Sequence, residues 1–180
     1  ILVTLSGIAA FFIVAIQIAP YRLQRILVFF NPDLDTMDKA YQLKQALIAI
    51  GSGGIFGKGA GMSMQKFGFL PQPMADSIFA VFSEEWGLVG ALILISLFLI
   101  FIWRGFSVAK NTQDKFYKLT AAGLSSWIAL QTFVNIGSMV GILPLTGIPL
   151  PFISYGGSAL VAELIGVGIL LNISKYRVKT

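Results

Sequence analysis

Long apolar runs without a charged residue constrain the fold of this chain more than any other feature. The first run covers residues 1–19, and another lies between Trp86 and Trp103. A helix as long as the first run rises about 28 Å, close to the thickness of the hydrocarbon core of a bilayer. With 56% hydrophobic and only 12% charged residues, the chain is predicted to be an all-α integral membrane protein. Because it begins at Ile1, inside an apolar run, we expect it to be a fragment of a longer protein.

Four transmembrane helices are expected within a single membrane domain of residues 1–180. They cover about residues 1–19, 86–103, 119–143 and 159–174. The intervening loop 20–85 is expected to contain short helices, one of them over about residues 36–50. Three prolines and three glycines exclude a regular helix over residues 144–158. Irregular backbone at membrane depth must be covered by protein or face a water-filled cavity.

Positive charges gather beside the expected helix ends. Only Asp114 opposes the seven basic residues Arg104, Lys110, Lys115, Lys118, Lys175, Arg177 and Lys179, whereas residues 20–87 carry six basic and six acidic residues. By the positive-inside rule the basic ends are cytoplasmic and loop 20–85 is extracytoplasmic. The net charge of +5 therefore indicates membrane orientation, and no nucleic acid partner is expected. A substrate of the loop is expected to be lipid-borne or soluble outside the cell.

Asp76 is the candidate catalytic residue. It follows the stiff sequence Leu-Pro-Gln-Pro of residues 70–73 and precedes an apolar run that begins after Ser77. A carboxylate at this boundary is partly desolvated, which favours a role as general base for a positioned hydroxyl. The alternative, slightly favoured by the local pattern, is that Asp76 caps the helix starting at Ser77. Histidine and cysteine are absent, so thiol catalysis and histidine metal sites are excluded within this chain, and no metal ligands are predicted.

Glycines are dense between Gly51 and Gly61. The pattern fits equally an anion-binding nest of backbone amides and a flexible surface loop. Lys58 and Lys66 are candidates for neutralising a phosphate, with binding to lipid headgroups as the alternative.

Other polar residues carry weaker signals. Glu84 is expected to be a solvated charge, too far along the chain to pair closely with the candidate acid, and solvation is also the alternative to a functional role for Glu85. Glu163 lies inside an apolar run, where an ionisable residue indicates a functional site, although its nearness to the outer end also permits solvation. Gln131 and Asn135 share one helical face and are expected to hold neighbouring helices in preference to contacting substrate.

An ordered set of short motifs extends over nearly the whole chain beyond Tyr21. The motifs are Tyr41-Gln42-Leu43 with Gln45, the segment 49–59, Gln65-Lys66, Leu70-Pro71, Asp76-Ser77-Ile78-Phe79, Glu84-Glu85-Trp86-Gly87, Asn135, Leu143-Pro144 and the segment 149–158. In this order they resemble the SEDS family (shape, elongation, division and sporulation), the peptidoglycan polymerases that include FtsW and RodA. The pair Gln65-Lys66 and the loop length before Leu70 are more similar to the FtsW type.

The resemblance implies a ten-helix fold of which this chain supplies the last four helices. It maps the family's catalytic aspartate onto Asp76, which would deprotonate the 4-hydroxyl of an acceptor sugar in the polymerisation of lipid II, the lipid-linked disaccharide-pentapeptide. The pyrophosphate leaving group needs positive charge from Lys58, Lys66 or a divalent cation such as Mg²⁺ or Mn²⁺. No other cofactor is expected. The implied substrate-binding residues are Lys58, Gln65, Lys66, Glu85, Asn135, Ser154, Gly156, Gly157 and Ser158.

The resemblance also implies partners and a location. These are undecaprenyl-pyrophosphate-linked glycan, a class B penicillin-binding protein and other divisome proteins, in the inner (plasma) membrane of a bacterium, with the active loop outside. The chain departs from the family at Met74-Ala75, where His-Thr is usual, and at Ser77, where Phe is usual. Two alternatives stay open: a flippase or transporter whose path includes Asn135 and Glu163, and a non-catalytic scaffold that recruits a penicillin-binding protein.

Overall fold

The described part of the protein is built from helices. The structure is a computed structural model that describes residues 39–65, 70 and 73–176. Its elements are α3 (Lys39–Ser52), α4 (Ile78–Lys110), α5 (Lys115–Met139) and α6 (Gly157–Ser174), and no strand occurs among these residues. The helical class is therefore confirmed. The expected first span, residues 1–19, lies outside the described residues.

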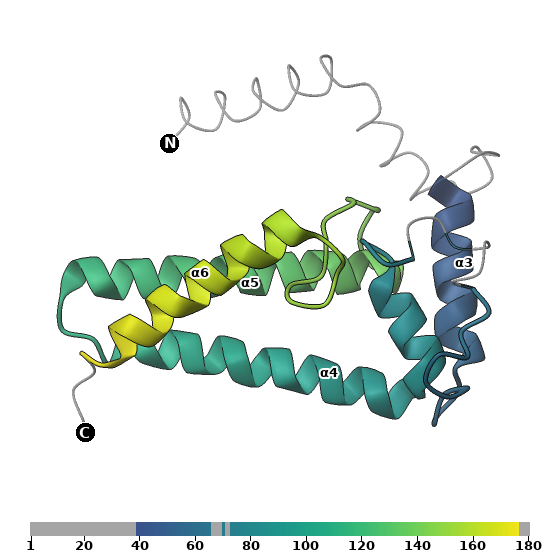
Figure 1. Ribbon diagram of the computed structural model, residues 1–180, viewed down its shortest axis with the longest axis horizontal. Helices are drawn as coiled ribbons and strands as arrows, with labels where there is room; N and C mark the ends of the chain where they lie inside the picture. The colour runs from purple at the N-terminus through teal and green to yellow at the C-terminus, as the bar shows by residue number, and fades with distance from the viewer. Residues whose placement is uncertain (1–38, 66–69, 71–72, 177–180) are drawn as a thin grey trace, which may run out of the picture.

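Three of the helices run along one another and the fourth lies across one end. α4 and α5 are joined by a short turn and lie side by side in opposite directions, and α6 lies against both (Figure 1). Asp114 starts α5 as its N-cap, because its Oδ1 accepts hydrogen bonds from the amides of Phe116 at 2.8 Å and Tyr117 at 3.1 Å. α3 packs at the end where α4 begins and α5 finishes (Figure 1).

Two helices are long and apolar enough to cross a membrane by length and composition, α4 and α6. α4 begins before the expected span 86–103 and continues beyond it, and α5 lies a few residues earlier than the expected 119–143. The segment between Val140 and Gly156 is irregular, as its prolines and glycines predicted. The membrane crossings themselves stay predictions.

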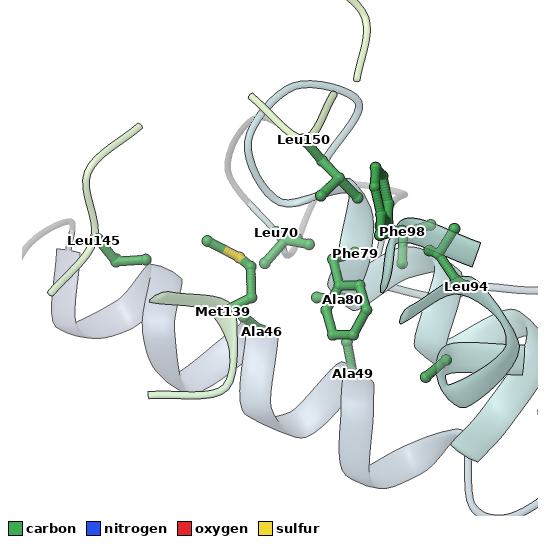
Figure 2. Packing of buried hydrophobic residues seen from close by; sticks show 12 residues of the cluster. Ala46, Ala49, Leu70, Phe79, Ala80, Leu94, Phe98, Met139, Leu145 and Leu150 are labelled. Carbon is green, nitrogen blue, oxygen red and sulfur yellow. The ribbon is translucent and has the colours of Figure 1, made fainter. Parts of the chain in front are cut away.

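The main apolar core lies where α3 meets the start of α4. Ala46 and Ala49 of α3 are fully buried, and their small side chains let this helix approach Phe79 and Ala80 of α4 (Figure 2). Residues from the end of α5 and the loop after it complete the cluster: Met139, Leu145 and Leu150. Burial of this cluster fixes the start of α4, and with it the residues just before Ile78, against the rest of the molecule.

α4 is broken at Gly87. This residue has φ 66° and ψ −167°, a conformation that only glycine adopts readily, and the helix axis bends there (Figure 1). A break leaves backbone groups without partners inside the helix, and buried groups of this kind must be satisfied elsewhere. The glycine-rich loop, residues 53–65, supplies the partners. The amides of Leu88 and Val89 donate to Gly54 O at 2.9 Å and Ile55 O at 3.1 Å.

The pairing continues on the other side of the break. The amides of Lys58 and Gly59 donate to the carbonyls of Glu84 and Glu85, each at 3.0 Å. A side chain at Gly57 would overlap the backbone of Glu85, which explains why glycine is needed there. The glycine-rich loop is therefore tied to α4 by backbone hydrogen bonds on both sides of the break.

Candidate active site

Asp76 is buried just before α4. Its side chain is 8% exposed, and its Oδ2 accepts a hydrogen bond from Gln42 Nε2 at 3.3 Å. Its Oδ1 is buried and has no hydrogen-bond partner among the described residues. The N-cap of α4 is Ser77, and no side chain caps this helix. The interpretation of Asp76 as the helix cap is therefore wrong.

The backbone around Asp76 is held by the segment that follows α5. Asn135 is fully buried, and its Nδ2 donates to Asp76 O and to Ile148 O, both at 2.8 Å. Ser154 Oγ donates to Ala75 O at 2.6 Å. Residues that lie more than fifty positions apart in sequence thus fix the backbone on which the carboxylate is carried.

The expectation that Asn135 holds a neighbouring helix is wrong, because its amide binds backbone carbonyls of two loops. Its Oδ1 has no hydrogen-bond partner among the described residues. Gln131, one turn earlier on α5, donates to Pro149 O at 3.0 Å and to Glu163 Oε1 at 3.2 Å.

Gln42 is a site residue that the sequence did not single out. Its amide donates both to Asp76 Oδ2 and to Ser77 Oγ at 3.0 Å. The residue lies on α3, and the sequence placed it only in the motif Tyr41-Gln42-Leu43 of the family resemblance. Its contact with Asp76 depends on the packing of α3 against the start of α4, which no local sequence pattern shows.

Glu84 is the centre of a second polar cluster, and the expectation that it is solvated is wrong. The side chain is fully buried. Its Oε1 accepts from Lys58 Nζ at 2.6 Å and from Ser52 Oγ at 3.2 Å, and its Oε2 accepts from Ser63 Oγ at 2.6 Å. The amides of Met64 and Gln65 also donate to the carboxylate, at 3.4 and 3.3 Å. A buried carboxylate needs such partners to offset its lost hydration.

The glycine-rich loop does bind an anion, and that anion is the carboxylate of Glu84. The loop supplies the donors from Lys58 to Gln65, so these groups are not arranged around an empty phosphate site. Burial raises the pKa of the Glu84 carboxyl. The hydrogen bonds from Lys58, Ser63 and the Gln65 amide together lower the pKa by more than burial raises it, so it lies below the ordinary value of 4.5. Glu84 precedes the helix break and lies outside the expected span 86–103.

The remaining predicted site residues fall into different places. Lys66 lies outside the described residues. Glu85 is half-buried, and its carbonyl accepts from Gly59. Gly156 is the N-cap of α6, Gly157 begins this helix, and Ser158 is exposed in its first turn. The structure therefore brings Asn135 and Ser154 to Asp76, and gathers Lys58 and Gln65 separately around Glu84.

Glu163 is buried, with 2% of its surface exposed, so the interpretation as a plainly solvated residue is wrong. Its Oε1 accepts from Gln131, and its Oε2 accepts from the amide of Phe152 at 2.8 Å. Among the described residues no group of three or more His, Cys, Asp or Glu side chains is placed to hold a metal ion. The divalent cation stays a prediction.

Comparisons with known proteins identify the family of this chain. A family model described as a cell cycle protein, covering FtsW, RodA and SpoVE, matches residues 1–179. Stage V sporulation protein E of Bacillus subtilis (strain 168) is 45% identical over 175 residues, which are 97% of this chain and 47% of that protein. A probable peptidoglycan glycosyltransferase FtsW of Halothiobacillus neapolitanus is 43% identical over 170 residues, which are 93% of this chain and 40% of that protein.

Solved structures show the same likeness. One match is a chain of a peptidoglycan synthase complex whose structure concerns the coordination of polymerization and crosslinking. The match covers 99% of this chain and 49% of that chain, with a TM-score of 0.71 and 28% identity. A mutant of the rod shape determining protein RodA of Thermus thermophilus matches 75% of this chain and 41% of its own, with a TM-score of 0.57 and 35% identity. The chain spans about half the length of the curated relatives it matches. It belongs to the FtsW/RodA/SpoVE family of membrane proteins.

Proposed function

We propose that this chain is the catalytic C-terminal part of a peptidoglycan glycosyltransferase that polymerises lipid II, with Asp76 as general base. The observation that carries the proposal is the buried Asp76 carboxylate, with Oδ2 held by Gln42 and Oδ1 without a partner among the described residues. A general base needs one free oxygen in a fixed position and a site that excludes most water. The names of the matched relatives supply the reaction class.

In the proposed reaction Asp76 Oδ1 accepts the proton of the acceptor sugar's 4-hydroxyl. The acceptor oxygen attacks the anomeric carbon of the donor, forming a β-1,4 bond with inversion, and the bond to the pyrophosphate of the lipid carrier breaks. The pyrophosphate leaves with the bonding electron pair and needs positive charge nearby. Holding base and acceptor in a fixed geometry lowers the barrier because the orientation is set before the reaction.

The positive charge for the leaving group has more than one candidate source. Lys58 Nζ forms an ion pair with Glu84 and is partly exposed. Because Glu84 already neutralises its charge, Lys58 attracts a phosphate less strongly than an unpaired lysine would. The other proposed substrate-binding residues are Gln65, Lys66, Glu85, Asn135, Ser154, Gly156, Gly157 and Ser158. A divalent cation bound by one carboxylate and the substrate phosphates is the alternative source of charge, because Mg²⁺ commonly binds in this way.

The wider setting is proposed on the same basis. The chain supplies the last four helices of a ten-helix fold in the bacterial inner membrane, and loop 20–85 faces outward. A class B penicillin-binding protein is the proposed partner that crosslinks the new strand. Support comes from the basic helix ends, the two apolar helices and the likeness to a peptidoglycan synthase complex.

The test is Asp76→Asn in the full-length protein, assayed with purified lipid II. Removing the base while keeping the size of the side chain should lower the rate of glycan formation by a factor of about 100 or more, with folding and partner binding unchanged. Asp114→Asn is the matched control, because Asn also caps a helix and this residue lies at the far end of α5. Polymerisation by the Asp76→Asn protein at the rate of the unmodified protein would overturn the proposal.

A further inference from the structure

We propose that Glu163 is a positioning residue for Asp76, and that it acts through a strained turn at Phe152. The proposal rests on the proposed function for its effect on catalysis. Its structural part, a connection from α6 to the backbone beside Asp76, is independent of the reaction.

The connection begins at the buried carboxylate of Glu163. This side chain extends from α6, is 2% exposed, and has a hydrogen bond on each oxygen. One bond comes from Gln131 of α5 and the other from the backbone amide of Phe152. Hydrogen bonds to a charged group are roughly twice as strong as those between neutral groups. Glu163 therefore holds the loop between α5 and α6 at one specific amide.

That amide belongs to a residue in an unfavourable conformation. Phe152 has φ 64°, and it is the only non-glycine residue with positive φ among the described residues. A left-handed conformation is unfavourable for a non-glycine residue and persists where its surroundings enforce it. The ring packs edge-on against Phe101 of α4, with centroids 5.7 Å apart. The bond to Glu163 adds a polar contact at the backbone of Phe152 to this ring contact and to the packing of Phe152 against the main apolar core.

The turn at Phe152 in turn holds the backbone next to Asp76. The amide of Leu150 donates to Ser154 Oγ at 2.6 Å, which closes the turn around Phe152. Ser154 Oγ then donates to Ala75 O at 2.6 Å, and the amide of Tyr155 donates to Met74 O at 2.7 Å. Relaxation of Phe152 would move Ser154 and Tyr155, and the residues preceding Asp76 would lose two of their hydrogen bonds.

The first experiment is Glu163→Leu in the full-length protein. We expect a fall in the turnover rate for lipid II polymerisation of about tenfold or more, because small misplacements of a catalytic group cost this much. The lipid II concentration at half-maximal rate should change less than about twofold. Glu163→Gln should lose less activity, since its amide oxygen can still accept from Phe152. Asp114→Ala is the control. It removes a carboxylate and a helix cap at a site away from Asp76, and this variant should polymerise normally.

The second experiment separates positioning through Phe152 from a general loss of stability. Phe152→Gly and Phe152→Ala both remove the ring contact, but only glycine adopts positive φ without strain. In the Glu163→Leu background, Phe152→Gly should therefore restore activity at least about threefold better than Phe152→Ala. Equal activity of the two double variants would overturn the proposed action through Phe152.

The third experiment does not depend on the reaction. Met74→Cys and Tyr155→Cys, in an otherwise cysteine-free full-length protein, place two exposed thiols on residues joined by a 2.7 Å backbone hydrogen bond. Their crosslinking yield should fall in the Glu163→Leu background and recover with Phe152→Gly. An unchanged yield with Glu163→Leu would overturn the connection. If Asp76→Asn polymerises normally, the proposed function fails, and the crosslinking yield still decides whether Glu163 positions this backbone.

Discussion

At the scale of single residues, two buried acids at the start of α4 have different environments. Asp76 has one oxygen held by Gln42 and one without a partner among the described residues, whereas both oxygens of Glu84 accept several hydrogen bonds. A saturated carboxylate is suited to hold a structure together, and an unsaturated one is suited to accept a proton. This difference assigns Glu84 to the glycine-rich loop and Asp76 to the proposed chemistry.

The role of Glu84 predicts a pH-dependent stability. Its folded-state pKa lies below 4.5, so the ionised group stabilises the fold fully above pH 4.5, and this stabilisation is lost as pH falls through the lower folded value. Glu84→Gln should therefore lower the stability of the full-length protein near pH 7 by about 1–3 kcal/mol. The difference from the unmodified protein should shrink below pH 4.5.

Thermal unfolding in detergent, followed across this pH range, measures the effect. Asp114→Asn serves as the control, since that residue is exposed and Asn retains its cap. A stability difference for Glu84→Gln that stays constant through the acid range would contradict the role of the ionised carboxylate.

At the scale of elements, the break in α4 is the feature that joins the glycine-rich loop to the apolar helix. The glycine-rich loop replaces hydrogen bonds that a continuous helix would make, and four of its backbone bonds reach across the break. A side chain at Gly87 would meet the carbonyl of Ile55 at 2.5 Å as well as requiring a strained φ. Because the overlapping atoms belong to the backbone of the glycine-rich loop, a side-chain rotation cannot relieve the overlap.

Gly87→Ala should therefore destabilise the full-length protein by at least about 2 kcal/mol, from strain and overlap together. Gly51→Ala is the matched control, because nothing lies within 4 Å of the methyl group it would add. The measurement is the apparent unfolding temperature in detergent, with limited proteolysis between residues 53 and 65 as a second readout. Equal stability of the two variants would show that the loop tolerates a different path.

At the scale of the whole molecule, the distribution of charge predicts the sidedness of the helices. The turn between α4 and α5 and the end of α6 are basic, while the loop between α5 and α6 lies at the opposite end beside Asp76. Gln113→Cys and Thr146→Cys place exposed thiols at these two ends, in an otherwise cysteine-free full-length protein. A membrane-impermeant thiol reagent should label position 146 in intact cells and position 113 only after lysis. The reverse labelling would place the proposed active loop in the cytoplasm.

The sequence by itself determined the helical class and the irregular segment after α5, because these depend on local composition and on backbone restrictions of proline and glycine. It did not reveal which polar groups meet. Gln42 contacts Asp76, Glu84 is enclosed by the glycine-rich loop, and Glu163 binds the amide of Phe152. Each contact joins segments that are distant in the chain, and burial decides whether a carboxylate is solvated or bound. Only the packing of the helices determines which of these segments meet and which carboxylates are buried.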